Sequence, residues 1–540
     1  MMVWRKLLAL LVIGFVSGCV SLRPELPRVP SYAVDHPEET SLGRSFAARL
    51  ADSPGLSGFH LLVSGEEAFI VRAATAEAAQ RTLDLQYFIV AGDATATLLL
   101  YRALRAAERG VRVRLLVDDV GTSDHDDLLS TLDAHPNIEV RAYNPFSGRG
   151  TWGLSRLLEY LGDGARLNRR MHNKLWIADN AVAVVGGRNL GDAYFAANQD
   201  NDFADLDTFV AGPLVREISR SFDAFWNSAA AIPIKTFSAT PPGPEQLAAT
   251  LAQLRARADK FRETDYAKSL RAMDFGRLLR GGQLALVSAP AAILHDVPDK
   301  TLPQGAEQPI FSVMRSTILA ARREALLISP YFIPSERGVS GLCSLAGKGV
   351  RVRILTNSLA STDVPVVHAG YARYRPRLLA CGVELHELRP GAKTTRRGLS
   401  SGASLHAKAV IVDRSALIIG SMNLDPRSRR VNTEVAVRIE SPILGEQLGA
   451  LFDEAVAPDQ AFRVELAESG NAAAALVWLG EVDGQSVRLD SEPLAGWWRH
   501  FLSGLLASLA PGNCFDVLYR LTSRSASGMA TSMNPSCARP

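Results

Sequence analysis

The 540-residue chain has few cysteines, little net charge and no hydrophobic run long enough to cross a membrane. Its five cysteines show no paired spacing, so no disulfide connectivity can be inferred from them. Cys343 and Cys381 lie in otherwise apolar stretches and are expected to be packed thiols. The net charge of +3 is too small to indicate a nucleic-acid partner from the whole sequence.

The longest apolar run, Leu7 to Val16, is too short to span a bilayer but has the length of a signal-peptide core. Arg5 and Lys6 precede it, and the sequence Val-Ser-Gly-Cys that ends at Cys19 resembles a bacterial lipoprotein processing box. Residues 1–19 are therefore predicted to be a lipoprotein-type signal peptide. In that case Cys19 becomes the mature N-terminus and carries the lipid. Several acyl chains together would anchor the protein firmly in the membrane. Cleavage elsewhere, or an uncleaved anchor, is the alternative.

Residues 20–40 follow as a tether, since their first part is rich in proline. Export is expected whether or not Cys19 is lipidated. The chain is thus predicted to be a membrane-associated protein of the bacterial envelope that faces the periplasm. The sequence does not tell the inner from the outer membrane, nor whether a protein partner is needed.

Two copies of one motif, H-x-K-x4-D, are the most informative feature of the chain. The first runs from His172 through Lys174 to Asp179, and the second from His406 through Lys408 to Asp413. The match continues downstream, where each copy has a Gly with an Asn three positions later, and then an acid with a Pro eight positions later. These residues are Gly186, Asn189, Asp205 and Pro213 in the first copy and Gly420, Asn423, Glu434 and Pro442 in the second. Chance does not explain this correspondence.

The residue types in the motif suit chemistry on a phosphate diester. Apolar residues after each lysine predict a buried strand with His and Lys at its mouth, and residues two apart share a face of a strand. An imidazole can attack phosphorus while ammonium and amide groups hold the anionic oxygens. Two such sets supply a nucleophile and a separate general acid/base, and Asp205 and Glu434 can orient the imidazoles. No cluster of acids or cysteines surrounds the histidines in the sequence, so chemistry without a metal or other cofactor is the simpler expectation.

Asp179 and Asp413 belong to the motif and are therefore among the catalytic candidates, but a structural role is favoured for both. Each comes five residues after its lysine, at the predicted end of a strand. An aspartate at that place commonly forms a turn.

The paired motif identifies the chain as a member of the phospholipase D superfamily, and the chain resembles bacterial cardiolipin synthases of the C type. The closer resemblance rests on the runs at 166–174, 185–189, 205–207, 355–360, 367–373 and 401–408 and extends over roughly residues 40–510. It implies phosphatidyl transfer through a phosphohistidine, with His172 as nucleophile and His406 as acid/base. Lys174, Lys408, Asn189 and Asn423 are then phosphate ligands, and Asp205 and Glu434 orient the histidines.

One position departs from the family pattern. Ser421 is also expected to bind substrate, whereas the first copy has Gly187 where many relatives have serine. Any hydroxyl contact to phosphate is then lost in the first half.

The two halves of the chain repeat strand–helix–strand alternation, which predicts an α/β fold. The predicted strands are Leu83–Ile89, Val111–Val117, Leu326–Ile333 and Val350–Leu355, with helices Ala94–Arg109 and one that ends near Gly349. The resemblance adds two similar phospholipase D-like domains, each a mixed sheet flanked by helices, with the active site at their interface. The predicted boundaries are 41–235 and 311–490, with a connector at 236–310 that contributes to the cleft.

Several segments have more than one interpretation. Basic residues precede each motif, at Arg166, Arg169 and Arg170 and again at Lys393, Arg396 and Arg397. They can attract anionic lipid headgroups or nucleic acid, or they can form solvated loops. Residues 491–510 are apolar at helical spacing, which fits an interfacial membrane helix or a helix packed on the core. Residues 511–540 are expected to be a disordered tail without an assigned role.

The predicted function is that of a cardiolipin synthase acting on phospholipid substrates at a membrane. Phosphatidylglycerol is the expected acceptor, and phosphatidylethanolamine or phosphatidylglycerol the donor. The alternative is a hydrolytic phospholipase D, in which water replaces the acceptor. A phosphodiesterase nuclease or a non-catalytic lipid-binding lipoprotein fits less well, because the predicted anchor disfavours nucleic acid and both His/Lys/Asn sets are complete.

Overall fold

The computed structural model describes residues 28–496 and Arg499, apart from 123–125, 147–153, 198–201, 238–241, 281–282, 300–308, 392–403 and 468–474. The predicted signal peptide with Cys19, the second basic cluster, most of the predicted interfacial helix and the C-terminal tail lie outside these residues. No helix among the described residues is long and apolar enough to cross a membrane.

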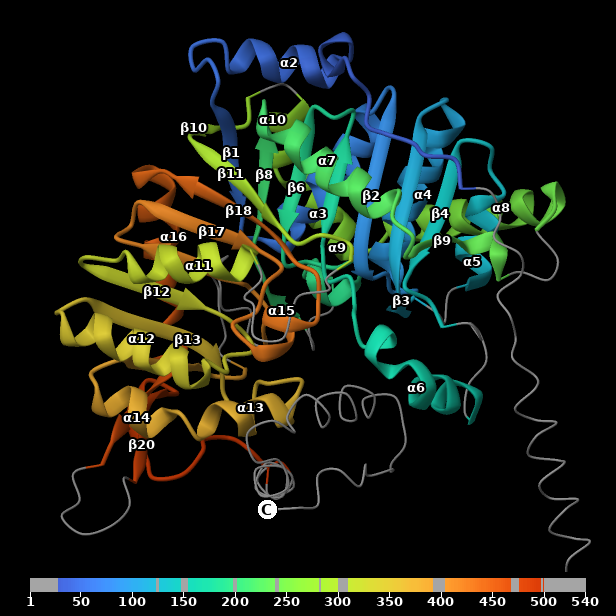
Figure 1. The fold of residues 1–540 in the computed structure, drawn as a ribbon. Helices are drawn as coiled ribbons and strands as arrows, with labels where there is room; N and C mark the ends of the chain where they lie inside the picture. Colours follow the sequence, from blue (N-terminus) through green and yellow to red (C-terminus); the bar gives the residue numbers. More distant parts are fainter. Residues whose placement is uncertain are drawn as a thin grey trace, which may run out of the picture.

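The first of two large sheets has nine strands in the order β10-β1-β8-β6-β5-β2-β3-β4-β9 (Figure 1). Its strands are β1 (Ser57–Leu62), β2 (Thr82–Ile89), β3 (Arg112–Gly121), β4 (Ile138–Tyr143), β5 (Leu175–Ala178), β6 (Val182–Gly186), β8 (Asp207–Ala211), β9 (Ala231–Pro233) and β10 (Val287–Ala289). Strands β2, β3 and β4 are parallel, and β5 pairs with β2 in antiparallel fashion.

The second sheet has ten strands in the order β11-β18-β17-β16-β12-β13-β14-β19-β20-β21. Its strands are β11 (Ala291–His295), β12 (Glu324–Ile328), β13 (Arg351–Asn357), β14 (Glu384–Leu388), β16 (Ala409–Val412), β17 (Ala416–Gly420), β18 (Val435–Glu440), β19 (Ala461–Leu466), β20 (Leu476–Val482) and β21 (Gln485–Leu489). The run β18-β17-β16-β12-β13-β14 repeats β8-β6-β5-β2-β3-β4 of the first sheet in order and in strand direction. The α/β fold with two similar halves is therefore confirmed.

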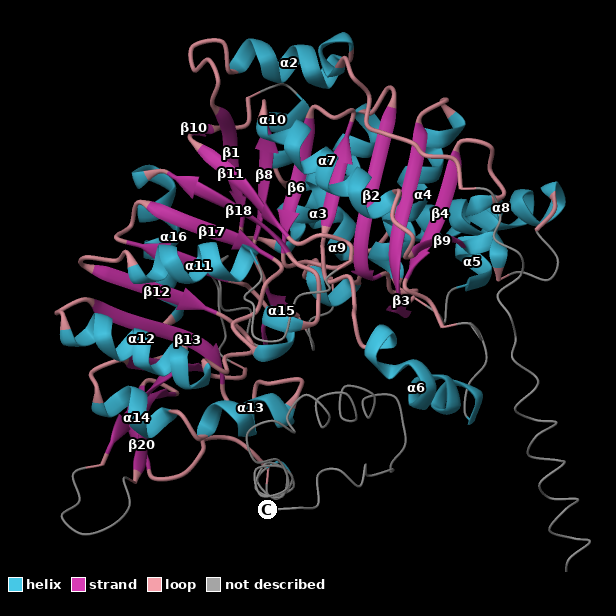
Figure 2. Cartoon of the chain, in the orientation of Figure 1, coloured by secondary structure: helices cyan, strands magenta, loops and turns pink. Residues whose placement is uncertain are grey.

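Helices flank both sheets (Figure 2). The first half contains α2 (Ser41–Arg49), α3 (Gly65–Ala78), α4 (Ala94–Glu108), α5 (Asp126–Asp133), α6 (Leu154–Leu167) and α7 (Leu214–Trp226). The connector adds α8 (Pro244–Arg262), α9 (Asp265–Ala272) and α10 (Phe275–Arg280). The second half contains α11 (Pro309–Leu319), α12 (Ser335–Gly347), α13 (Pro365–Ala372), α14 (Arg375–Ala380), α15 (Pro426–Arg430) and α16 (Pro442–Ala455).

The two halves share a hydrophobic core. Buried side chains of β5, β6, β8 and α7 pack in one cluster with those of β16, β17, β18 and α16. Phe222 of α7 and Phe452 of α16 are both fully buried members of this cluster. A continuous apolar core resists relative motion of its parts, because close-packed interiors do not deform continuously. Residues contributed by opposite halves can therefore be held at fixed distances.

The connector joins the two sheets directly. Its strand β10 pairs with β1 at the edge of the first sheet, and its strand β11 pairs with β18 at the edge of the second. Only Pro290 separates these two strands. Asp296, just beyond β11, accepts a hydrogen bond from the backbone N–H of Glu434, so the connector also reaches the neighbourhood of the predicted site.

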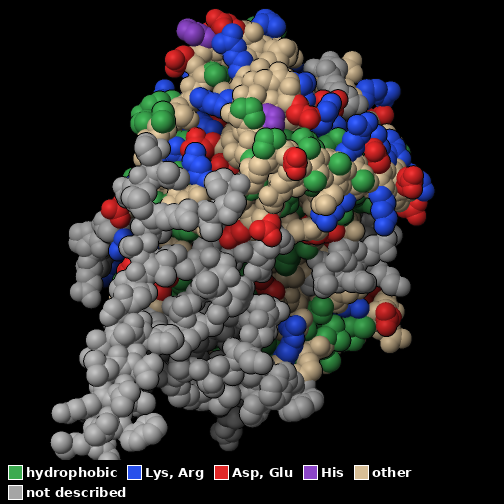
Figure 3. Space-filling view, turned by 90° about the vertical axis from the view of Figure 1, so that its right-hand side faces the viewer, with side chains coloured by type: hydrophobic (Ala, Val, Ile, Leu, Met, Phe, Trp, Pro, Cys, Tyr) green, Lys and Arg blue, Asp and Glu red, His purple; other side chains and the backbone are tan. Residues whose placement is uncertain are grey.

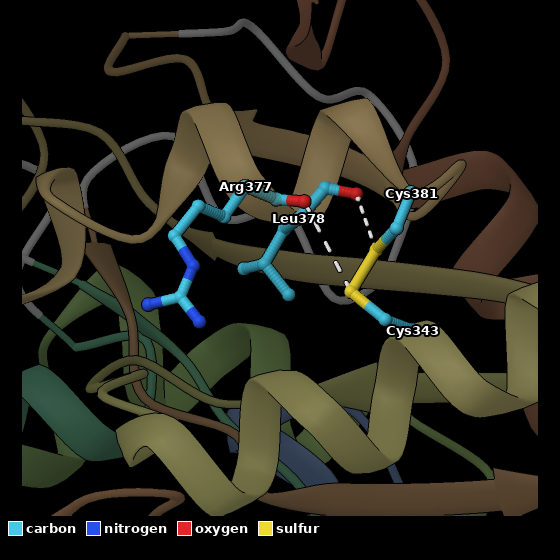
Figure 4. Close-up of a disulfide and its surroundings, with 4 residues drawn as sticks. All are labelled: Cys343, Arg377, Leu378 and Cys381. Atoms are coloured by element: carbon cyan, nitrogen blue, oxygen red, sulfur yellow. Dashed lines mark hydrogen bonds between the residues drawn. A yellow bond between two sulfur atoms is a disulfide. The ribbon is translucent and has the colours of Figure 1, made fainter.

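A disulfide joins α12 to the end of α14 (Figure 4). Cys343 and Cys381 are bonded, with their Cα atoms 5.3 Å apart. The prediction that they are packed thiols is wrong. An apolar stretch indicates that a residue packs against the core, but it does not show that two helices bring two side chains within bonding distance.

Basic and acidic side chains are interspersed on the face of the molecule that carries α5 and α8 (Figure 3). Because opposite charges are interspersed on this face, their electrostatic potentials largely cancel at long range. This distribution agrees with the small net charge of the chain.

Candidate active site

Just before the strand of each motif, the backbone of the motif histidine forms a hydrogen bond with the opposite half of the chain. The backbone N–H of His172 donates to the carbonyl of Thr433 at 2.9 Å, one residue before Glu434. In the other direction, β15 (Ser404–Leu405) pairs with β7 (Phe203–Ala204), and the N–H of His406 donates to the carbonyl of Ala204 at 2.7 Å. Each histidine is thus fixed beside the segment that carries the acid of the other half.

The histidine–acid pairs are exchanged between the halves. His172 Nδ1 lies 2.9 Å from Glu434 Oε2, and His406 Nδ1 lies 2.5 Å from Asp205 Oδ2. Glu434 and Asp205 are fully buried, and both histidines are only 7 % exposed. Because an ionised carboxylate only accepts hydrogen bonds, each Nδ1 is the donor and each Nε2 keeps its lone pair.

The electrostatic surroundings distinguish the two histidines. Burial, with Lys174, Lys408 and Arg427 nearby, places the pKa of His172 well below its ordinary value. Burial and Lys408 also lower the pKa of His406, to about 4, although Asp205 opposes this shift. The free site therefore holds two neutral imidazoles at neutral pH.

The two motif lysines are buried next to the histidines. Lys174 Nζ donates to the carbonyl oxygen of His172 at 2.7 Å, and Lys408 Nζ donates to that of His406. Both side chains are at most 2 % exposed. Burial lowers the pKa of Lys408 to about 8 and that of Lys174 well below its ordinary value. Buried ammonium groups gain strongly from an anion, because the low local dielectric magnifies the attraction.

The two asparagines are buried at corresponding positions but have different contacts. Asn189 accepts from the backbone N–H of Ile89 and donates to the hydroxyl of Tyr194 at 2.9 Å. The side-chain oxygen of Asn423 has no hydrogen-bond partner among the described residues. Asn189 is therefore fixed by protein contacts, whereas part of the Asn423 amide is available to a ligand.

Ser421 and Gly187, which correspond in the two halves, both contact an orienting acid. The Ser421 hydroxyl donates to Glu434 Oε2 at 2.6 Å, the same oxygen that His172 approaches. In the first half, a Cβ added at Gly187 would lie 2.2 Å from Asp205 Oδ1. Glycine thus leaves room for the Asp205 carboxylate, and Ser421 supports Glu434. The expected contact of Ser421 with substrate stays a prediction.

The match to a known protein family also falls into two segments, one in each half of the chain. The family model described as "Cardiolipin synthase, PLD-like domain" matches residues 73–226 and 314–456, together more than half of the chain. Each matched segment contains one motif. The chain belongs to this phospholipase D-like family. It is an enzyme of the phosphatidyltransferase type.

Individual relatives cover most of the chain. Cardiolipin synthase C of Escherichia coli (strain K12) is 39 % identical over 465 residues, covering 85 % of this chain and 96 % of that protein. An uncharacterized protein of Helicobacter pylori (strain ATCC 700392 / 26695) is 32 % identical over 444 residues, covering 82 % and 88 %. Among solved structures, the phosphatidylserine synthase of Haemophilus influenzae Rd KW20 aligns with a TM-score of 0.49 at 14 % identity, covering 76 % of this chain and 89 % of that one.

The motif aspartates of this phospholipase D-like chain contact backbone rather than the histidines. Asp179 accepts hydrogen bonds from the N–H groups of Gln80, Arg81 and Thr82, and Asp413 accepts from those of Arg322, Arg323 and Glu324. Both adopt left-handed conformations, with φ of 54° and 50°, at the ends of β5 and β16 that lie away from the histidines. These contacts hold the start of a neighbouring strand.

All three arginines of the first basic cluster lie near acidic side chains. Arg170 is buried, and its guanidinium lies 3.4 Å from Asp118. Arg166 pairs with Asp163 and Glu159, and Arg169 lies 3.4 Å from Asp299. Because Arg170 is buried, it neither faces lipid headgroups nor lies in a solvated loop, which were the two interpretations of its position before the motif.

Sequence reasoning missed several residues around the histidines. Phe88 packs edge-on against His172, with ring centroids 5.2 Å apart, and Tyr194 does the same to His406 at 5.3 Å. Asp296 of the connector holds the backbone of Glu434. The Tyr-Phe-Ile sequence shared by 87–89 and 331–333 was a usable signal for Phe88. No spacing pattern marks Tyr194 or Asp296.

Proposed function

We propose that the chain is a cardiolipin synthase that transfers a phosphatidyl group to phosphatidylglycerol. The observation that carries the proposal is the exchanged pair of histidine–acid contacts, with two buried lysines beside them. Two neutral imidazoles and two cations at one buried place suit a phosphodiester anion that must be attacked from one side and released from the other. The identity to cardiolipin synthase C of Escherichia coli supports the choice of substrates.

In the first step, His172 Nε2 attacks phosphorus and the bond to the headgroup oxygen breaks. Glu434, bound to Nδ1, offsets the positive charge that develops on the imidazole. His406 is protonated on Nε2 when the anionic substrate binds, and it delivers this proton to the departing headgroup oxygen, which leaves as the alcohol. Asp205, hydrogen-bonded to Nδ1 of His406, stabilises the protonated imidazole that this role requires.

In the second step, His406 takes a proton from a glycerol hydroxyl of phosphatidylglycerol. The resulting oxygen attacks phosphorus, the P–N bond to His172 breaks, and cardiolipin forms. The lysines hold the anionic oxygens throughout. Phosphatidylethanolamine or a second phosphatidylglycerol serves as the donor.

Export with a lipid anchor at Cys19 is part of the proposal. The disulfide between Cys343 and Cys381 supports an oxidising compartment such as the periplasm, because cytosolic thiols are usually kept reduced. Membrane attachment would also place the site at its lipid substrates.

The test uses the full chain and vesicles that contain labelled phosphatidylglycerol, with or without phosphatidylethanolamine. The proposal predicts labelled cardiolipin from the wild type and none from His172→Ala. An increase with phosphatidylethanolamine identifies that lipid as the donor. Phosphatidic acid without cardiolipin would instead make the protein a hydrolytic phospholipase D.

A further inference from the structure

The residue before each motif histidine is held by a side chain from the sheet of its own half. In the first half, the backbone N–H of Met171 donates to Asp118 Oδ2 at 2.9 Å. In the second half, the N–H of Leu405 donates to Asn357 Oδ1 at 2.9 Å, and Asn357 Nδ2 donates to the carbonyl of Leu405 at 2.9 Å. Asp118 is fully buried and Asn357 is 2 % exposed. Hydrogen bonds in such surroundings are strong, because water does not compete for them.

Asp118 and Asn357 occupy the same place in the two halves. Strands β3 and β13, which carry them, have corresponding positions in the two sheets (Figure 1). Each residue comes four positions after a Val-Arg-Val-Arg sequence. Each also forms the last residue pair with the neighbouring strand, Asp118 with Tyr143 and Asn357 with Leu388. The repeat of the fold therefore includes a polar side chain at this strand end.

Asn357 acts on the segment that joins His406 to the opposite half. Successive N–H groups of an extended segment point to opposite sides. The N–H of Leu405 points to Asn357, and the next N–H, that of His406, donates to the carbonyl of Ala204. Ala204 directly precedes Asp205, the acid that contacts His406. The segment is thus held from one side by its own half and from the other side by the segment of its acid.

The first half repeats this arrangement. The N–H of Met171 donates to Asp118, and the next N–H, that of His172, donates to the carbonyl of Thr433. Thr433 directly precedes Glu434, the acid that contacts His172. Two hydrogen bonds on opposite sides leave an extended segment little freedom to rotate or shift. The backbone at each motif histidine is therefore fixed before any substrate binds.

The two side chains differ in what they can donate. The Asn357 amide both donates and accepts, which matches the two backbone groups of the residue that it holds. The Asp118 carboxylate only accepts, from the N–H groups of Met171 and Val120, and it lies 3.4 Å from the Arg170 guanidinium. Exchange of an amide for a carboxylate, or the reverse, therefore has different consequences in the two halves.

We propose that Asp118 and Asn357 are positioning residues of the reaction, each of which holds a motif histidine in its reactive position by fixing the backbone of the preceding residue. The reacting nitrogen must meet phosphorus at the correct distance and angle, and a misplacement of about 1 Å can cost about 100-fold in rate. A side chain that fixes the backbone next to the histidine therefore supports catalysis as well as stability. The kinetic consequences rest on the proposed function, whereas the fixing of the histidines does not.

The kinetic test uses the full chain and vesicles of labelled phosphatidylglycerol. Asp118→Ala and Asn357→Ala are each expected to lower kcat about 10–100-fold with little change in apparent KM, because the lysines still hold the phosphate. Asp84→Ala is the control for the first variant, since it removes a buried aspartate that pairs with Arg114 in the same sheet. Asn137→Ala is the control for the second, since it removes an amide that donates to a backbone carbonyl at 3.0 Å. Both controls are expected to keep the wild-type kcat per folded molecule.

Conservative variants separate the hydrogen bond from the rest of the side chain. Asp118→Asn keeps an oxygen that accepts from Met171, so it is expected to recover most of the rate that Asp118→Ala loses, although Arg170 loses its carboxylate and stability falls. Asn357→Asp is expected to remain as slow as Asn357→Ala, because a carboxylate cannot donate to the carbonyl of Leu405 and repels it. Equal rates of Asp118→Asn and Asp118→Ala would overturn the role given to the bond with Met171.

NMR of the ring nitrogens supplies a readout that needs no turnover. The signals of His172 are expected to change most in Asp118→Ala and those of His406 in Asn357→Ala, with neither changed in the two controls. Wild-type kcat per folded molecule in both alanine variants, or unchanged histidine signals, would overturn the proposal. If the signals change as expected but the wild type makes no cardiolipin, the positioning of the histidines stands and the proposed function fails.

Discussion

Asp205 accepts a hydrogen bond from His406 Nδ1 at 2.5 Å, although the two residues are 201 positions apart and belong to opposite halves of the chain. Glu434 and His172 form the reciprocal pair across 262 positions. Each motif histidine therefore contacts its acid only across the boundary between the halves. The shared apolar core between the halves is a requirement of the chemistry as well as of stability.

Because the acids are exchanged between the halves, each acid substitution should disturb the histidine of the opposite half. Asp205→Asn is expected to lower the rate of transfer by about 10²–10⁴-fold, because the asparagine NH₂ can donate to Nδ1 and so favours the wrong tautomer of His406. NMR of the ring nitrogens measures this directly. The signals of His406 should change with Asp205→Asn, and those of His172 with Glu434→Gln. The opposite assignment would refute the exchange.

Gly187 should not tolerate a side chain. Gly187→Ala is expected to lower activity by about 10–100-fold, since the added Cβ pushes the Asp205 carboxylate away from His406. Kinetics of transfer and the His406 signals measure the effect. Gly347→Ala, where nothing lies within 4 Å of the added atom, is the matched control. Full activity in Gly187→Ala would show that Asp205 has room to move.

Binding of an anion should draw protons into the site. The pKa of Lys408 is lowered to about 8 and that of His406 to about 4 in the free site, mainly by burial. A bound anion favours the charged forms and raises both pKa values, so protons are taken up near pH 8 by Lys408 and near pH 5 by His406. Titration calorimetry with dimethyl phosphate in buffers of different ionisation enthalpy measures the uptake. Binding without any uptake at either pH would contradict these protonation states.

The motif aspartates should affect stability more than chemistry. Asp179→Asn is expected to lower the free energy of unfolding by about 1–3 kcal/mol, because an amide oxygen replaces a carboxylate that accepts from three backbone N–H groups. Asp413→Asn should lower the free energy of unfolding by a similar amount. Denaturant unfolding and the rate per folded molecule separate the two effects. A large loss of rate with unchanged stability would assign both residues to catalysis.

Removal of the disulfide should destabilise the second half. The bridge closes a loop with a sequence separation of 38, for which the chain-entropy model gives about 3–4 kcal/mol. Cys343→Ser with Cys381→Ser is expected to lower the melting temperature of the full chain, and reductant should do the same to the wild type. Equal melting temperatures with and without reductant would show that the bridge does not form.

Local sequence patterns predicted much of the fold. The strand and helix expected at 83–89 and 94–109 correspond to β2 and α4, because the periodicity of apolar residues is a local property. The strand expected at 326–333 ends at Ile328 instead. Pro330 has no N–H to donate, and the chain turns there toward the Asn423 segment.

The sequence predicted which residues form the site, but not which histidine contacts which acid. Spacing identified His172, His406, Asp205 and Glu434, yet spacing within one half cannot reveal that each acid reaches the other half. The contacts of Tyr194 and Asp296 depend likewise on how the two sheets meet. The same limit explains the missed disulfide, which joins two helices through tertiary packing.

The most direct test of the account is to trap the covalent intermediate. The full-length His406→Asn variant is mixed with labelled phosphatidylglycerol vesicles, quenched in alkali and mapped by mass spectrometry. The account predicts a phosphatidyl group on His172 in this variant and no labelled histidine in His172→Asn. Label on His406 in His172→Asn, with none on His172 in the other variant, would contradict it.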